Sequence, residues 1–239
     1  MSGHSKWHNI AEKKGKTDSQ RAKAFTQLAR YITIAVRKGG PDASFNFALR
    51  TAIEKAKEGN VPKDNIERAI KKGTGELAGE EIVQNRYEGY GPGGVAMIVD
   101  TMTDNANRTV ADLKHLFSKM GGNLAGSVAW QFDNKGVIHI VGAAAKASDD
   151  DWMLQLLDNG GDNAEADGDD LIVLTAPNKL QAVKDWLETL GLKAASSQLS
   201  LLPKETMAVD GDVKTQLMKL IEAVEEMDDV EKVWHNAQL

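Results

Sequence analysis

The sequence contains no cysteine and no long hydrophobic run. The lack of cysteine excludes disulfide bonds, thiolate catalysis and zinc sites built on cysteine. The longest purely apolar run is Val95–Val99, far shorter than the ~20 residues of a membrane-spanning helix. The first residues, Met1–Trp7, carry no apolar segment of the kind that forms a secretion or organelle-targeting signal. We therefore expect a cytoplasmic protein with no membrane-bound part.

The sequence also lacks a recognisable catalytic motif. It has neither G-x-S-x-G nor H-E-x-x-H. The run Asn163–Gly168 begins like a calcium-binding EF-hand loop, but Leu174 occupies the twelfth position, where calcium requires Glu. His4 and His8 lie four residues apart without a carboxylate or thiolate partner that would complete a metal site. We therefore predict a protein that is no enzyme and has no metal or cofactor.

Acidic residues are scarce at the beginning of the chain, although the net charge of the whole chain is −6. Residues 1–75 hold 16 Lys and Arg against 7 Asp and Glu, a net charge of +9. Residues 76–239 hold 13 against 28, a net charge of −15. Such an asymmetry is typical of a basic module that binds a polyanion and is carried on an acidic body.

Three amphipathic helices are predicted in the basic part, over residues 17–38, 43–58 and 62–72. Their apolar residues recur with helical spacing, and Phe45 counts toward the apolar stripe of the second helix. In the first helix Lys23, Arg30 and Arg37 lie seven residues apart on the face opposite the apolar stripe. An ordinary solvated helix surface would explain this row. We interpret it as a binding face because a basic N-terminal segment precedes it.

Trp7 stands within that basic segment and has two interpretations. It can stack on a nucleobase, or it can dock on the helices and hold the segment in place. The full set of residues expected to contact nucleic acid comprises the cations of the segment and of the helices together with this tryptophan: Lys6, Trp7, Lys13, Lys14, Lys16, Arg21, Lys23, Arg30, Arg37, Lys38, Lys63, Arg68, Lys71 and Lys72.

The acidic part predicts alternating strands and helices. Residues 135–203 read strand–helix–strand–strand–helix–strand, the ferredoxin-like pattern. The flanking residues 82–134 and 204–239 spell the same pattern when joined, with strands at 94–101, 127–132, 206–209 and 230–236. We expect the glycine-rich run before residue 95 to be a turn and Asp133–Gly136 to be a turn between two strands. Arg108, at a predicted helix start, is a weak candidate for phosphate binding.

The predicted fold class is therefore α+β with three domains. Residues 1–75 form a basic helical domain that begins with a flexible arm. Residues 82–134 and 204–239 form a discontinuous ferredoxin-like domain. Residues 135–203 form a second, acidic ferredoxin-like domain inserted into the first.

Several motifs together resemble the YebC/PmpR family. They are Gly3–Trp7, Pro62–Gly75, Tyr87–Val95, Thr103–Asn105, Asn107–Thr109, Gly121–Leu124, and Gly126–Val128 with Trp130 and Phe132. The resemblance covers the whole chain and is strongest in residues 1–132. It implies an N-terminal helical domain and two α/β domains. It also implies a DNA-binding transcriptional regulator without catalysis or cofactor, and its mitochondrial relatives are translational activators.

Two functions remain open at this point. The first is a DNA-binding transcriptional regulator. Because the sequence shows no helix-turn-helix reading head, such a regulator should bind duplexes with little sequence preference. The alternative, which the resemblance also implies, is a ribosome-associated translation factor that binds ribosomal RNA and eases stalls at proline-rich stretches. A pair of small-molecule-sensing domains is a third, weaker hypothesis. The expected partners are nucleic acid and the ribosome, with no membrane, and the chain is expected to be a monomer or a weak homo-oligomer.

Overall fold

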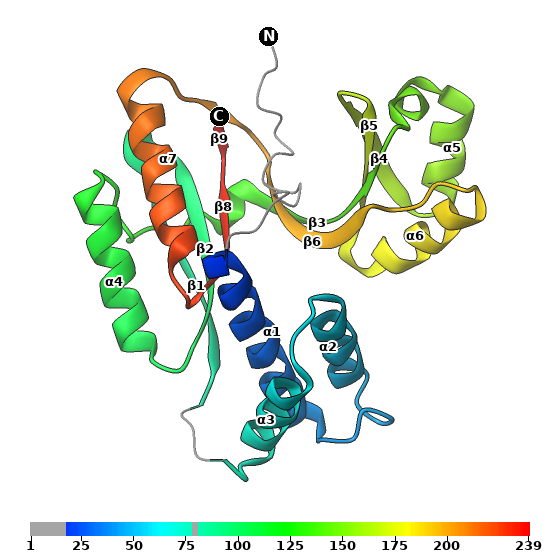
Figure 1. Cartoon of the computed structure of the whole chain (residues 1–239). Coiled ribbons are helices and arrows are strands. Elements are labelled where there is room, and N and C mark those ends of the chain that lie inside the picture. Colours follow the sequence, from blue (N-terminus) through cyan, green and yellow to red (C-terminus); the bar gives the residue numbers. More distant parts are fainter. Residues whose placement is uncertain (1–17, 78–80) are drawn as a thin grey trace. The chain divides into compact units, whose positions relative to one another are not determined.

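Three helices form the N-terminal part of the computed structural model, which describes residues 18–77 and 81–239 (Figure 1). They are α1 (Asp18–Gly39), α2 (Phe47–Glu58) and α3 (Lys63–Thr74). The predicted helices are confirmed, but α2 begins four residues later than expected. The reason is Asn46, whose side chain accepts a hydrogen bond from the backbone N–H of Leu49 at 3.0 Å and caps the helix. Phe45 therefore precedes the helix and is exposed, so its assignment to the apolar stripe is wrong.

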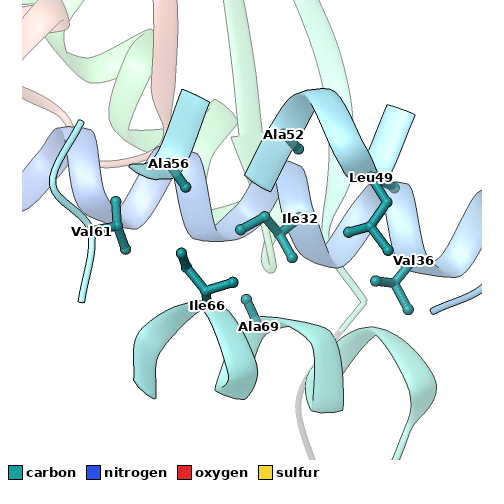
Figure 2. Packing of buried hydrophobic residues seen from close by; sticks show 9 residues of the cluster. Ile32, Val36, Leu49, Ala52, Ala56, Val61, Ile66 and Ala69 are labelled. Atoms are coloured by element: carbon teal, nitrogen blue, oxygen red, sulfur yellow. The ribbon is translucent and has the colours of Figure 1, made fainter. Parts of the chain in front are cut away.

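The apolar faces of the three helices meet in one core. Figure 2 shows Ile66 and Ala69 of α3 pointing toward Ile32 of α1, and all three are buried. Gly73 of α3 packs closely against Thr33 and Val36 of α1. A Cβ atom on Gly73 would lie 2.6 Å from Cβ of Val36 and 2.9 Å from the carbonyl oxygen of Thr33. This contact fixes how closely the two helices pack.

Gly73→Ala is expected to destabilise the protein by about 2 kcal/mol. Alanine normally stabilises a helix relative to glycine by up to about 1 kcal/mol, but here the added methyl group overpacks the contact between α1 and α3. Urea unfolding of the two proteins measures the difference. Asn65→Ala, at an exposed position of the same helix, is the control and should change the free energy of unfolding by less than about 0.5 kcal/mol. A stabilising effect of Gly73→Ala would contradict the packing described.

The contacts divide the described residues into two units. One contains the residues up to Ser127 together with Gly211–Val233, and the other contains Val128–Asp210 and Trp234–Leu239. The first unit holds the three helices, strands β1 (Val83–Tyr90) and β2 (Ala96–Thr103), helices α4 (Ala106–Lys119) and α7 (Gly211–Glu226), and strand β8 (Val230–His235) as far as Val233. The predicted division of the chain into three domains remains a prediction.

The sheet of the first unit has three strands, in the order β1-β2-β8. This differs from the ferredoxin-like pattern predicted for the flanking residues. The expected strand at 127–132 is absent from the described residues, where a 3-10 turn, η2 (Ala129–Gln131), stands instead. The glycine-rich run was predicted as a turn, but its first half is β1, which pairs antiparallel with β2. Gly89 is required in β1 because a Cβ atom there would lie 2.4 Å from the carbonyl oxygen of Asn123.

The second unit has the ferredoxin-like arrangement that the sequence predicts for residues 135–203. Its elements are β3 (Phe132–Ile140), α5 (Asp150–Asp158), β4 (Gly161–Asp167), β5 (Asp170–Thr175), α6 (Leu180–Thr189) and β6 (Ser196–Pro203). The strand order β4-β5-β3-β6 is antiparallel throughout, so each helix connects two strands that are separated by a third. The predicted turn at Asp133–Gly136 is wrong, because these residues lie inside β3 and pair with β6.

Short elements complete the chain. Strands β7 (Met207–Ala208) and β9 (Ala237–Gln238) pair in parallel. The remaining 3-10 turns are η1 (Pro92–Gly94), η3 (Ala144–Ser148) and η4 (Pro177–Lys179). Among the described residues, no helix is both long enough and apolar enough to cross a membrane.

Candidate nucleic-acid interface

The outer side of α3 carries an exposed group of cations. Ile66 and Ala69 face the core, and helical spacing places Arg68, Lys71 and Lys72 on the side away from them, where all three are exposed. We call these three residues the α3 basic face. Lys71 and Lys72 stand in the last turn, where positive charge also complements the helix dipole. Within residues 18–77 and 81–239, none of these three cations forms an ion pair.

Three other predicted cations, Lys63, Lys38 and Arg37, are weaker candidates for phosphate contacts. The side chain of Lys63 is 86% exposed, and its ammonium lies 3.6 Å from a carboxylate oxygen of Glu67. An ion pair this exposed contributes little and exchanges readily with other partners. Lys38 is exposed in the last turn of α1, and Arg37 lies 3.9 Å from the carboxylate of Glu81. These groups extend the positive charge of the helices without forming a defined site.

Two members of the basic row on α1, Lys23 and Arg30, make hydrogen bonds within their own unit. The guanidinium of Arg30 donates to the carbonyl oxygen of Met102 at 2.6 Å and to a carboxylate oxygen of Asp229 at 3.0 Å. Its side chain is only 14% exposed. Lys23 donates to the carbonyl oxygen of Glu225, and burial lowers its pKa. Lys23 and Arg30 therefore bind backbone and carboxylate oxygens of their own unit, and their contact with nucleic acid stays a prediction.

Further contacts continue this packing along α1. The amide of Gln27 donates to the carbonyl oxygen of Val230 at 2.7 Å. The hydroxyl of Tyr31 donates to the carboxylate of Glu231, and burial together with this hydrogen bond raises the pKa of Tyr31. The polar face of α1 thus contacts the chain from the end of α7 to the start of β8. Arg21, near the start of α1, is exposed.

The carboxylate of Asp229 accepts hydrogen bonds from several side chains of this unit, and no sequence motif predicts this role. Its carboxylate accepts hydrogen bonds from the hydroxyls of Thr103 and Thr109 and from the guanidinium groups of Arg30 and Arg108, at 2.8–3.1 Å. Burial alone would raise the pKa of Asp229. The hydrogen bonds from Arg108, Thr109 and Thr103 and the charge of Arg30 outweigh burial and hold the pKa below its ordinary value.

Arg108 also binds the carboxylate of Asp229. The sequence marked it as a weak candidate for phosphate binding at the start of α4. In the structure, its Nη2 atom lies 2.8 Å from Asp229 and 3.0 Å from Asp104. Two carboxylates therefore neutralise this guanidinium, which explains its position without a phosphate.

The remaining predicted contacts lie outside the described residues. They are the cations and the tryptophan of the N-terminal segment: Lys6, Trp7, Lys13, Lys14 and Lys16. Within residues 18–77 and 81–239, no group of three or more His, Asp or Glu side chains is placed to hold a metal ion.

Family models match almost the whole chain. Residues 5–76 match the model described as the TACO1/YebC protein N-terminal domain. Residues 79–237 match the model described as the TACO1/YebC second and third domain. The boundary between the two matches falls directly after α3, where the basic part of the sequence ends.

Close relatives match over their full length. A protein of Pelotomaculum thermopropionicum is 45% identical over 100% of this chain and 99% of its own, and one of Carboxydothermus hydrogenoformans is 46% identical with the same coverage. Each is named a probable transcriptional regulatory protein. The crystal structure of a conserved hypothetical protein from Aquifex aeolicus is 43% identical, with a TM-score of 0.79 over 98% of this chain and 96% of that one.

Proposed function

Because this chain belongs to the TACO1/YebC family, as its motifs predict, we propose that it regulates gene expression by binding nucleic acid, without catalysis. The first candidate ligand is duplex DNA. The name of the relatives, probable transcriptional regulatory protein, supports this choice. The three N-terminal helices, α1 to α3, carry no helix-turn-helix reading head, which favours contacts to phosphates over contacts to base edges.

The α3 basic face is the observation that carries this proposal. It places three cations on one exposed side of a short helix, while the acids of α3, Asp64 and Glu67, lie in its first half. Cations that neutralise phosphates release condensed counterions, and this release supplies most of the affinity of sequence-tolerant binding. Lys6, Lys13, Lys14 and Lys16 add positive charge in the same part of the sequence. Lys23 and Arg30 are left out of the proposed interface because their contacts are intramolecular.

Ribosomal RNA is the second candidate, and the charge distribution favours it. Residues 76–239 carry a net charge of −15, which a bare duplex repels. A ribosome offers both phosphates for the basic helices and basic proteins for the acidic part. In this case the chain would be a translation factor, and Trp7 would stack on an exposed base.

Co-sedimentation with ribosomes at near-physiological salt, with and without a large excess of duplex DNA, separates the two candidates. Pelleting that survives the DNA competitor supports ribosomal RNA as the ligand. Loss of the protein from the pellet when DNA is added supports duplex DNA. A protein that neither pellets with ribosomes nor shifts a DNA duplex in a gel at the same salt would contradict the proposal as a whole.

A further inference from the structure

Two phenylalanines project from the connection between α1 and α2. The exposed fraction is 92% for Phe45 and 72% for Phe47, the two highest values among the large hydrophobic residues that the structure describes. Isolated exposed apolar residues are common, but two aromatic rings two positions apart form a local aromatic surface. We call them the Phe45–Phe47 pair.

The backbone that carries this pair is held in place by a buried asparagine. Asn46 lies between the two phenylalanines and is only 5% exposed. Its side-chain amide nitrogen donates to the carbonyl oxygens of Ala35 and Gly40, each at 2.8 Å, while its side-chain oxygen caps α2. Since the residue between them points inward, both rings are directed outward from a fixed anchor.

A turn at Asp42 fixes the approach to the pair. The carbonyl oxygen of Asp42 accepts hydrogen bonds from the backbone N–H groups of Phe45 and Asn46, at 3.2 and 2.9 Å. Its carboxylate accepts one from the backbone N–H of Ser44 at 2.8 Å. The loop is therefore ordered by its own hydrogen bonds, and ligand binding would cost little conformational entropy there.

The charge beside the pair identifies the kind of ligand that fits. The guanidinium carbon of Arg50 lies 5.2 Å from the centre of the Phe47 ring, a cation–π arrangement. Arg50 is exposed on α2, and Lys38 is exposed in the last turn of α1, before the loop. An apolar peptide segment would gain nothing from these cations. A nucleobase linked to a phosphate matches both the rings and the charges, because every base has a π-face and each phosphate is an anion.

We propose that the Phe45–Phe47 pair stacks on unpaired nucleobases while Arg50 contacts a neighbouring phosphate. This inference rests on the proposed function and deepens it, since it names single-stranded segments as part of the ligand. Bases inside a duplex are already stacked, so the pair discriminates against duplex.

The test measures binding of the full chain to fluorescein-labelled 12-nucleotide probes by fluorescence anisotropy. The probes are oligouridine RNA, the matching oligothymidine DNA, an abasic strand of equal length and a 12-base-pair duplex. Substituting both Phe45→Ala and Phe47→Ala should weaken binding to the two single strands by about tenfold or more, because each base–aromatic stack contributes on that scale. Binding to the abasic strand and to the duplex should change less than about twofold. The RNA and DNA arms show which sugar the site accepts.

Matched variants keep the test independent of folding. Phe45→Trp retains a stacking surface and should retain binding. Leu154→Ala with Leu157→Ala removes two exposed apolar side chains from α5 and should leave all four affinities unchanged. Far-UV circular dichroism should give the same melting curve for the phenylalanine variant as for the unsubstituted protein, because both rings are exposed.

The outcomes separate this inference from the proposed function. If the unsubstituted chain binds none of the probes and no ribosomes, the proposed function fails. If it binds and the phenylalanine variant binds single strands equally well, stacking is refuted while the proposed function stands. An equal loss on the abasic strand would also refute stacking. If the phenylalanine variant keeps its affinity for every probe and only its sedimentation coefficient differs from that of the unsubstituted chain, the pair is a self-association surface and the inference is overturned.

Discussion

Replacing Asp229 by alanine is expected to lower the free energy of unfolding by about 3 kcal/mol. The substitution leaves the guanidinium of Arg30 largely buried without its carboxylate and removes the acceptor of two threonine hydroxyls. Removing one partner of a buried ion pair typically costs 3–5 kcal/mol. Because Arg108 is half-exposed and water can solvate it after the substitution, we expect a cost at the lower end of this range. Urea denaturation followed by far-UV circular dichroism measures the difference.

The neighbouring residue provides the matched control. Asp228 is exposed, its backbone carbonyl accepts a hydrogen bond from Arg30, and its carboxylate acts on Lys23 by charge alone. Asp228→Ala removes the same charge from the same loop, so it should change the free energy of unfolding by less than about 0.5 kcal/mol. Equal effects of the two substitutions would show that general charge near α1, and not the hydrogen bonds of Asp229, holds the helix in place.

The stability difference between the unsubstituted protein and Asp229→Ala should also depend on pH. The folded pKa of Asp229 lies below its unfolded value of about 3.9. The stabilisation from the ionised carboxylate is therefore fully present above that unfolded value and is lost as the pH falls through the folded pKa. The stability gap should be constant between about pH 5 and 8 and should narrow below about pH 4. A gap that widens on acidification would contradict the direction of the shift.

Reversing the α3 basic face should weaken nucleic-acid binding by about 100-fold at near-physiological salt. The variant carries Arg68→Glu, Lys71→Glu and Lys72→Glu. Three phosphate contacts on duplex DNA release nearly three counterions, and their loss at about 0.15 M salt corresponds to an affinity change of this size. All three side chains are exposed, so the fold should persist with a small cost at the end of the helix. Fluorescence anisotropy with a labelled duplex measures the affinity.

The control reverses three exposed cations elsewhere in the same unit. Lys114→Glu, Lys119→Glu and Lys219→Glu change the net charge by the same amount on α4 and α7. This control should bind within about threefold of the unsubstituted chain, because its charges make no proposed phosphate contact. A comparable loss in both variants would mean that only the net charge matters and that α3 is no interface.

The sequence predicted the helices and the inserted ferredoxin-like sheet because each depends on local periodicity. The order β4-β5-β3-β6 follows once a helix joins each pair of separated strands. Strand β1 was missed because Gly89 and Gly91 are typical of a turn. The close approach of Asn123 that makes Gly89 necessary is a tertiary contact with no local signal.

The candidate site was predicted only in part, for a related reason. Spacing alone placed Lys23 and Arg30 on the polar side of α1, and a polar side can face either water or an acidic partner. The partner here is Asp229, about 200 positions away in the chain. The same limit applies to Phe45, which helical spacing assigned to the core, although the N-cap at Asn46 makes α2 begin only at Phe47.

The salt dependence of binding tests the central claim most directly. The logarithm of the association constant for a labelled duplex is plotted against the logarithm of the salt concentration, for the unsubstituted chain and for the variant reversed at Arg68, Lys71 and Lys72. If these residues contact phosphates, the slope of the variant should be smaller in magnitude by about 3. Parallel lines would contradict the claim, because they would show that the α3 basic face displaces no counterions.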